Sequence, residues 1–395
     1  MRDRRFPALD SLRAIAALSI LAYHAVGFYA RGAGEETLIG PYVARLDVGV
    51  TLFFLLSGFL LYRPFVQARR DGLPQPRLLP YAWRRTLRIV PAYWVALTLA
   101  AVVLSLPGVL TPSGIVTFYG FLQVYDGDTA LKGLGQCWTL CVEVAFYALL
   151  PLWAWLVRRL APGRSLRAEL AALVLLAAVG IAYKAVVLGA FGSVTVSFEP
   201  TLLVLPAFLD HFALGMAIAV LEVGWEERGA APALVTRRPA LWWAAAAAVF
   251  VGVAAVSGID ATPAESTPGE YAVRHAANAA VALGLLLPAV VGTGIVGAFL
   301  VWTPLRWLGI VSYGIFLYHL PFLQLLSDQG LSRWEAHVHP YLLWAGAGLA
   351  GAVALATLSW FAIERPALRL KPPAGPHPRA RPRPAAAPPG PAPRA

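Results

Sequence analysis

Ten apolar stretches, each long enough to cross a lipid bilayer, constrain the fold of this chain more than any other feature. The hydrocarbon core of a bilayer requires about 20 apolar residues per helix. Such stretches lie near residues 9–29, 48–66, 88–107, 137–157, 169–190, 201–223, 240–257, 275–300, 307–327 and 341–363. Because backbone polar groups in lipid must be satisfied within the segment, we predict an all-α polytopic membrane protein with about ten transmembrane helices.

The composition supports a membrane protein and argues against a soluble domain and against a nucleic-acid-binding protein. Of the 395 residues, 58% are hydrophobic and 13% are charged, whereas soluble domains are about half apolar and a quarter charged. The net charge of +11 fits basic cytoplasmic loops better than a nucleic-acid-binding surface. Cys137 and Cys141 lie four positions apart within one predicted span. They form neither a disulfide framework nor a metal-binding motif, so we interpret them as core residues and predict no metal.

The distribution of basic residues predicts the orientation in the membrane. With the N-terminus in the cytoplasm, the inner segments hold 25 of the 32 lysines and arginines and the outer segments hold five. Cytoplasmic loops carry such an excess, so we predict cytoplasmic N- and C-termini in the plasma membrane. The stretch 'GIVTFYGFLQVY' (114–125) is short, and a full crossing there would place the basic 'RRLAPGRSLR' outside. We therefore expect a re-entrant or interfacial segment.

Two regions follow from the hydropathy pattern. Residues 1–366 form one transmembrane domain, beginning with a retained first span rather than a cleaved signal peptide. Residues 367–395 are rich in Pro, Ala and Arg without an apolar pattern, which is typical of a disordered tail. We expect Gly49 and Gly58, within the second span, to permit close helix packing. The Ala-, Arg- and Pro-rich usage suggests a bacterial source.

Ionisable side chains inside the spans are candidates for function, because burying charge in lipid is costly. They are Asp10, Arg13, His24, Glu143, Lys184, Asp210, His211 and His319. Eleven residues separate Arg13 from His24, which is three helical turns plus about 20° and about 16 Å along the axis. One helix face could therefore present both to one cavity. Lys184, near the outer end of its span, is expected to extend its amine towards the interface.

Six stretches in this order resemble the membrane-bound acyltransferase family 3, of the O-antigen acetyltransferase type, over most of residues 6–366. They are 'LDSLRAIAALSILAYHA' (9–25) with an Arg-x10-His pattern, 'DVGVTLFFLLSGFLLYR' (47–63), 'WRRTLRIVPAYW' (83–94), 'CWTLCVEVAFYALLP' (137–151), 'LGIVSYGIFLYHLP' (308–321) and 'IERP' (363–366). Thr139 stands where the family usually has Ser, and a hydroxyl is retained. The resemblance implies transfer of an acyl group, usually acetyl, from cytoplasmic acyl-CoA to a hydroxyl. The implied acceptor is a lipid-linked or exported glycan or a glycosylated metabolite.

The resemblance gives roles to residues of the first and fourth spans. His24 is expected to be the general base for the acceptor hydroxyl, since histidine titrates near neutral pH. A variant in which His24 is acylated first stays open. Arg13 is expected to position acyl-CoA, or else to pair with Asp10. Glu143 is expected to orient His24, or else to form a hydrogen bond between helices.

The remaining candidates are expected to bind the two substrates. Arg85 and Arg88 lie three residues apart on one helix face, and their guanidinium groups suit the phosphates of CoA, although cytoplasmic anchoring is the alternative. Ser57, Ser312 and Tyr313 either line the donor cavity or join helices. His319 and Asp210 are candidates for contact with the acceptor.

One function of another class stays open. A proton-coupled transporter or flippase could use His24, Glu143 and Asp210 as a proton relay. Transporters usually show repeated halves, and we detect none in this sequence. Binding of acyl-CoA distinguishes the two functions, since an acyltransferase of this kind requires it and a transporter does not.

Overall fold

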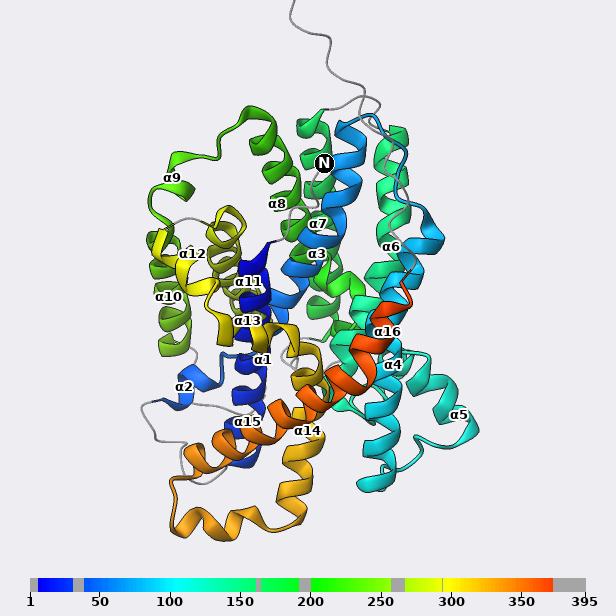
Figure 1. Cartoon of the computed structure of the whole chain (residues 1–395), viewed down its shortest axis with the longest axis vertical. Coiled ribbons are helices and arrows are strands. Elements are labelled where there is room, and N and C mark those ends of the chain that lie inside the picture. Colours follow the sequence, from blue (N-terminus) through cyan, green and yellow to red (C-terminus); the bar gives the residue numbers. More distant parts are fainter. Residues whose placement is uncertain are drawn as a thin grey trace, which may run out of the picture.

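The fold is a bundle of helices without a strand in any described residue (Figure 1). The computed structural model describes residues 6–30, 39–160, 165–191, 200–256, 267–292 and 294–371. Its longer helices are α1 (Pro7–His24), α3 (Val48–Arg70), α4 (Leu78–Val103), α6 (Trp138–Leu160), α7 (Leu166–Phe191), α8 (Leu209–Arg228), α10 (Pro239–Val256), α11 (Pro268–Val291), α14 (Ser312–Asp328) and α15 (Pro340–Ser359). Residues 372–395, most of the predicted disordered tail, lie outside the described part.

The predicted number of spans is confirmed. Nine helices of the described part are long and apolar enough to cross a membrane, and one bent pair can supply a tenth span. That pair is α13 (Thr303–Ile310) and α14, which meet at an angle of 68°. The continuous span predicted at 307–327 is therefore broken. The span predicted at 275–300 is shorter at its end, because α11 ends at Val291 and α12 (Gly294–Leu300) is a separate helix.

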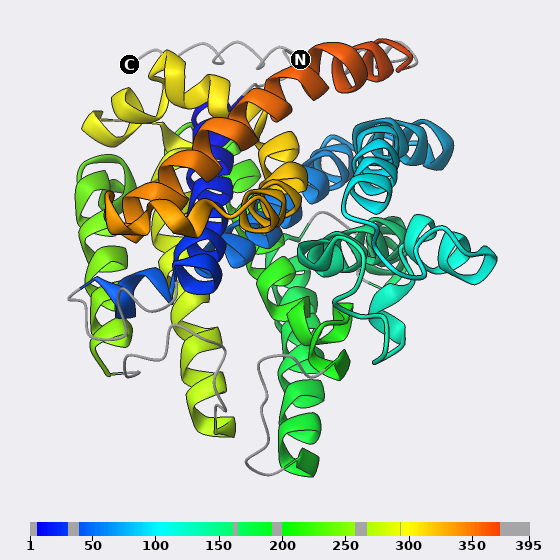
Figure 2. The ribbon, with the colours of Figure 1, turned by 90° about the horizontal axis from the view of Figure 1, so that it is seen from below.

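The short apolar stretch at 114–125 does not form a transmembrane helix. It begins at the last residue of α5 (Pro112–Gly114) and contains the π-helical turn η2 (Ile115–Tyr119) and the 3-10 turn η3 (Gln123–Tyr125). These turns lie at one side of the bundle, away from α10 (Figures 1 and 2). The hydroxyl of Tyr93 on α4 donates to the Phe118 carbonyl at 2.8 Å, which ties the segment to a span.

Helix α1 lies in the interior of the bundle. Seen from below (Figure 2), it is placed among α3, α11, α14 and α15, and it contacts all four as well as α13. The shorter helix α16 (Arg365–Arg369) follows η9 (Trp360–Glu364) and lies beside α4 (Figure 1).

Close packing of α3 against α8 depends on two glycines. A Cβ on Gly58 would lie 2.4 Å from the Phe212 carbonyl oxygen, and a Cβ on Gly215 would lie 2.1 Å from that of Leu55. Only glycine permits two backbones to approach so closely. The prediction of close packing at Gly58 is therefore confirmed, and so is that at Gly49, where a Cβ would meet the Ala16 carbonyl oxygen at 2.5 Å.

Two prolines within spans release backbone carbonyls that side chains of neighbouring helices satisfy. Pro321 in α14 cannot donate to Leu317, and the buried Gln136 amide donates to that carbonyl at 3.0 Å. Pro151 in α6 likewise cannot donate to the Tyr147 carbonyl. The Tyr81 hydroxyl donates to that carbonyl instead, at 3.2 Å. An unsatisfied carbonyl in lipid costs several kcal/mol, so these contacts stabilise α14 and α6 where they border the candidate site.

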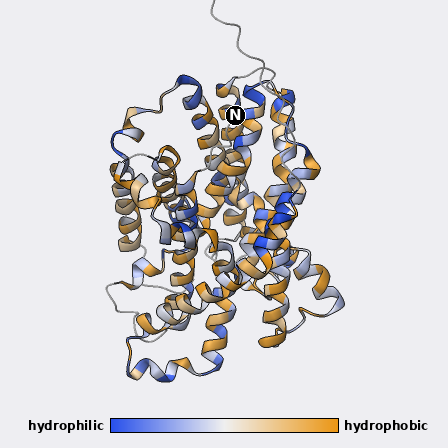
Figure 3. Ribbon diagram, viewed as in Figure 1, coloured by the Kyte–Doolittle hydropathy of each residue, from blue (hydrophilic) through white to orange (hydrophobic). Residues whose placement is uncertain are grey.

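The outer surface has the polarity expected for a protein in a bilayer. Hydrophilic residues gather at the upper ends of several long helices and at the turn between α14 and α15, while the middle of most helices is apolar (Figure 3). In the most apolar window of α8, 78% of the residues are buried, but only 17% are in α10. Helix α8 is thus a core helix, and α10 presents most of its surface to lipid.

Candidate active site

A cavity between α1, α3, α4, α6 and α14 brings together most of the predicted site residues. It encloses about 850 Å³, counted out to its open mouth. The predicted residues in its wall are Arg13, Ser57, Arg85, Arg88, Thr139, Glu143, Ser312 and Tyr313. These come from five helices that are distant in sequence, so only tertiary packing places them together. We call this space the first cavity.

The first cavity has a basic end and an apolar end. Arg13 lies at the basic end, and Ile20 lies seven residues further along α1, about 10 Å at the usual helical rise. Phe53 and Phe316 line the apolar end with Ile20. A long ligand with a charged head and an apolar tail would therefore fit with its head at the arginines.

Arg13 both pairs with Asp10 and lines the first cavity. Its Nη1 donates to Asp10 Oδ1 at 3.3 Å, and both side chains are about one-third exposed. Arg13 also lines the first cavity. Because an ion pair at such exposure contributes little to stability, the pairing leaves the guanidinium available for an anion.

Arg85 and Arg88 lie in the first half of α4 without a salt bridge to any residue that the structure describes. Arg84 and Lys371 add further positive charge. Burial, followed by the charges of Arg88, Arg85 and Arg84, lowers the pKa of Lys371. Glu364 is buried and attracts Arg88, but from beyond salt-bridge distance. The polar patch where α4 meets α16 (Figure 3) is thus strongly cationic.

Glu143 is held by two hydroxyl groups in the wall of the first cavity. Ser57 and Tyr147 both donate hydrogen bonds to its Oε1, the second at 2.7 Å. The Arg85 guanidinium lies 6.0 Å from the centre of the Tyr147 ring. Tyr147 was missed in the sequence, although it follows Glu143 by four positions and so lies on the same helix face.

The break between α13 and α14 positions two further predicted residues. Ser312 and Tyr313 begin α14 directly after the break. The Ser312 hydroxyl donates to the Gly309 carbonyl at 2.8 Å, and the Tyr313 hydroxyl donates to the Ile89 carbonyl at 2.8 Å. Both hydroxyls therefore hold backbone groups together, while their side chains form part of the cavity wall.

His24 and His319 form a pair that sequence reasoning did not predict. His24 ends α1, one turn beyond Ile20, and is followed by the π-helical turn η1 (Ala25–Tyr29). His24 Nδ1 lies 3.0 Å from His319 Nε2. His319 is fully buried on α14 and contacts His24, and its predicted contact with the acceptor stays a prediction. Glu143, which was predicted to orient His24, bonds to Ser57 and Tyr147.

The hydrogen bonds of this pair assign the protons on both rings. His319 Nδ1 lies 3.1 Å from the Ile315 carbonyl oxygen. Because a carbonyl only accepts, Nδ1 carries a hydrogen and Nε2 of the neutral ring is an acceptor. His24 Nδ1 lies near two acceptors, the Ile20 carbonyl oxygen at 2.9 Å and His319 Nε2. His24 therefore carries its hydrogen on Nδ1 and its lone pair on Nε2.

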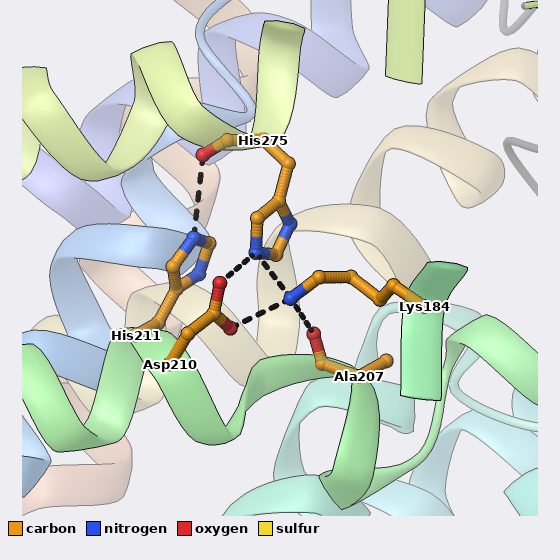
Figure 4. A network of polar contacts seen from close by, with 5 residues as sticks. All are labelled: Lys184, Ala207, Asp210, His211 and His275. Carbon is orange, nitrogen blue, oxygen red and sulfur yellow. Dashed lines mark hydrogen bonds and ion pairs between the residues drawn. The ribbon is translucent and has the colours of Figure 1, made fainter. Parts of the chain in front are cut away.

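A second polar cluster joins α7, α8 and α11 (Figure 4). Lys184 Nζ donates to Asp210 Oδ1 at 2.8 Å and to the Ala207 carbonyl at 2.9 Å, and it lies 2.9 Å from His275 Nε2. His275 Nε2 lies 2.8 Å from Asp210 Oδ2. Lys184 is only 7% exposed, so the expectation that it extends to the interface is wrong. The carboxylate of Asp210 holds it inside.

This cluster has the ligand atoms of a metal site, but a lysine ammonium already contacts two of its three residues. Asp210, His211 and His275 offer ligand atoms that all lie within 4.8 Å of one another. The Lys184 ammonium already contacts two of these residues, and its positive charge would repel a metal ion. We therefore assign no metal to these residues. His275 was missed in the sequence because it is the first residue of the predicted span at 275–300, whereas α11 begins seven residues earlier, at Pro268, and places it inside the helix.

Comparisons with known proteins agree with the acyl-transfer signatures. The family described as "Acyltransferase domain" matches residues 6–361. "Nodulation protein 10" of Rhizobium leguminosarum bv. viciae is 28% identical, over 92% of this chain and 93% of its own length. "Acyltransferase MdmB" of Streptomyces mycarofaciens is 31% identical, over 40% of this chain and 41% of its own. "O-acetyltransferase OatA" of Staphylococcus aureus (strain NCTC 8325 / PS 47) is 28% identical, over 38% of this chain and 24% of its own. No solved structure matches the chain.

Proposed function

This chain belongs to the acyltransferase family 3, and on that premise we propose that it is an acyl-CoA-dependent integral-membrane O-acyltransferase. It would move an acyl group, acetyl by analogy with the named O-acetyltransferases, to a hydroxyl of a glycan, glycolipid or glycosylated metabolite. The observation that carries this proposal is the basic end of the first cavity, where Arg85 and Arg88 form no salt bridge within the described part of the chain.

The basic end suits the charged head of coenzyme A. Two guanidinium groups that form no salt bridge with a carboxylate of the described residues are expected to bind anions, because charge in an apolar environment requires a partner. Arginine forks match phosphate oxygens in pairs, and coenzyme A carries a pyrophosphate and a ribose phosphate. Arg13 and Lys371 add charge near the same end. We therefore assign Arg85 and Arg88 to the donor phosphates and Arg13 to positioning the donor.

The apolar end suits the pantetheine arm and the acyl group. Ile20, Phe53 and Phe316 line it, and the Phe316 ring lies 6.0 Å from the ring of His319. His24 follows one turn beyond Ile20. A thioester that extends from the arginines along the cavity would thus place its carbonyl carbon near the paired histidines.

His24 is the proposed general base. Its Nε2 lone pair would accept the proton of the acceptor hydroxyl while the hydroxyl oxygen attacks the thioester carbonyl. The tetrahedral intermediate then collapses, the C–S bond breaks, and the CoA thiolate takes the proton from His24. His319 would hold His24 in the required tautomer and orientation, as the third group of a catalytic triad does. The alternative with an acyl-His24 intermediate uses the same Nε2 atom as nucleophile.

Binding and transfer, measured separately, test the proposal. Purified full-length wild type and His24→Ala would be titrated with acetyl-CoA by calorimetry. Transfer of labelled acetyl from acetyl-CoA would be followed in membranes of the source bacterium. We expect both proteins to bind, and His24→Ala to lose about 10²–10⁴-fold in transfer rate, the usual contribution of a general base. Wild type that binds neither acetyl-CoA nor longer acyl-CoAs would overturn the proposal.

A further inference from the structure

A second cavity lies beside the first, between α3, α6, α8 and α11. It encloses about 590 Å³, counted out to its open mouth. Its polar wall consists of Asp47, Thr51, His211, Arg274, His275 and Asn278. None of these residues takes part in the donor site described above, and we call this space the second cavity.

Two hydrogen-bond acceptors in the second cavity lack a donor. Asp47 Oδ1 and His211 Nδ1 are inaccessible to solvent, and neither has a hydrogen-bond partner among the residues that the structure describes. His211 is only 1% exposed, and its Nε2 lies 3.3 Å from the His275 carbonyl oxygen. Nε2 therefore carries the hydrogen, which leaves Nδ1 as an acceptor. Because such atoms are costly when unsatisfied, the cavity calls for a ligand that donates hydrogen bonds.

The charges around the second cavity are balanced, unlike those of the first. Arg274 attracts Asp47 within the wall. Behind the wall, Lys184 pairs with Asp210 at 2.8 Å. His211 stacks on His275 with ring centres 3.9 Å apart, and a second positive charge there, beside the Lys184 ammonium, would be repelled. The second cavity therefore suits a neutral ligand rather than an anion.

Aromatic rings supply the rest of the wall. Trp138, Phe208 and Tyr271 line the second cavity, and the Trp138 and Phe208 rings lie 5.5 Å apart. Binding sites for small molecules combine such apolar surfaces with a few placed polar groups. The flat C–H faces of a sugar ring match aromatic surfaces, while its hydroxyls donate to the acceptors.

The two cavities are neighbours and share part of their wall. Val50 lines both of them. Trp138 lines the second cavity, and the next residue, Thr139, lines the first. Tyr23, which precedes His24 in α1, interacts electrostatically with Asp47 and Arg274 of the second cavity. A ligand in the second cavity would thus lie next to the acyl end of the first.

From these observations we infer that the second cavity binds the acceptor, a neutral polyhydroxyl ligand of carbohydrate character, and presents one of its hydroxyls towards His24. This inference rests on the proposed acyl transfer. It assigns His211 and Asp47 to the acceptor, and it places Asp210 and Lys184 behind them as positioning residues, in place of the direct acceptor contact first expected of Asp210.

Two conservative variants and a matched control test the inference. His211→Phe keeps a flat ring against His275 and removes the Nδ1 acceptor. Asp47→Asn keeps the size of the side chain and removes its charge. Val273→Ala, on α11 at a position that is 61% exposed, is the control outside the cavity. Each full-length protein would be titrated with acetyl-CoA, and transfer of labelled acetyl into alkali-labile esters would be measured in membranes of the source bacterium.

We expect His211→Phe to lower the initial transfer rate at least tenfold and Asp47→Asn several-fold, with the acetyl-CoA affinity of both within twofold of wild type. Val273→Ala should match wild type in both assays. Unchanged transfer in the two variants would overturn the inference and leave the proposed donor site intact. Loss of acetyl-CoA binding in both would make the cluster structural and would also overturn it. Failure of wild type to bind acetyl-CoA would instead contradict the proposed function itself.

Discussion

Arg63 and Arg70 on α3 differ from Arg85 and Arg88 on α4 in their partners, although all four belong to one basic region of the sequence. Arg63 Nε donates to Glu222 at 2.7 Å and its Nη2 donates to Glu226 at 2.8 Å, and Arg70 Nε donates to Glu227 at 2.6 Å. These carboxylates belong to α8. Arg85 and Arg88 line a cavity and form no salt bridge with any described residue.

The difference shows how the same residue type serves structure at one place and binding at another. Arginines that are neutralised by α8 fix the position of α3 against α8 and have little attraction left for a ligand. Arginines that form no salt bridge with a described residue and line a partly buried cavity can attract an anion from outside the protein. If this difference between the two pairs of arginines is functional, changes to Arg85 and Arg88 should affect donor binding and changes to Arg63 and Arg70 should not.

The largest expected effect is on donor affinity when the unpaired arginines are removed. Arg85→Ala/Arg88→Ala should weaken acetyl-CoA binding on the order of a thousandfold, because each charge-assisted hydrogen bond contributes about 1.5–3 kcal/mol and about 1.4 kcal/mol is tenfold. Calorimetry on the purified protein measures this. The matched control, Arg63→Ala/Arg70→Ala, should stay within twofold of wild type in affinity. Equal losses of acetyl-CoA affinity in both double variants would mean that the two pairs of arginines do not differ in donor binding.

A smaller effect is expected from His319, which acts through His24 and not through the donor. His319→Leu should lower the transfer rate about 10–100-fold, since His24 loses the acceptor that fixes its tautomer, and acetyl-CoA affinity should not change. In His319→Gln the side-chain carbonyl can accept from His24 Nδ1, so part of the activity should return. A pH–rate profile distinguishes this role from packing, because the acidic limb, where His24 becomes protonated and stops acting as a base, should shift in His319→Leu. Equal activity in the Leu and Gln variants would argue for packing alone.

Arginine-to-lysine substitutions sharpen the contrast further. Arg85→Lys/Arg88→Lys keeps both charges and loses the planar forks, so acetyl-CoA should bind about tenfold more weakly than to wild type. The same titration measures the change. An affinity equal to that of wild type would mean that charge alone, rather than geometry, attracts the donor.

The smallest effect on donor binding is expected from a substitution that weakens only the packing of α3 against α8. Gly58→Ala places a methyl group 2.4 Å from the Phe212 carbonyl oxygen, and such overpacking should lower the free energy of unfolding by about 1–3 kcal/mol. Thermal unfolding of the purified protein measures the loss. At a temperature where the variant is folded, its acetyl-CoA affinity should equal that of wild type. A large loss of affinity without a loss of stability would link α3–α8 packing directly to the donor site.

The class of fold and the candidates for the donor site follow from local features of the sequence. A bilayer of nearly constant thickness imposes helices of about 20 apolar residues, so the spans are readable without a structure. The cost of charge in lipid singled out Arg13, His24 and Glu143. The signatures of the family added Arg85, Arg88, Ser57, Ser312 and Tyr313. All of these except His24 line the first cavity, and His24 lies one turn beyond it.

Which of these groups contact one another depends on how the helices pack. Residues 295 positions apart make the His24–His319 pair, and residues from three helices make the Lys184–Asp210–His275 cluster. Periodicity gives the face of one helix but not the helix that packs against it. Which arginines are neutralised depends on the carboxylates of α8, and which acceptors stay unsatisfied depends on every neighbour of the second cavity. Partner choice between distant segments is a property of packing, and local sequence does not encode it.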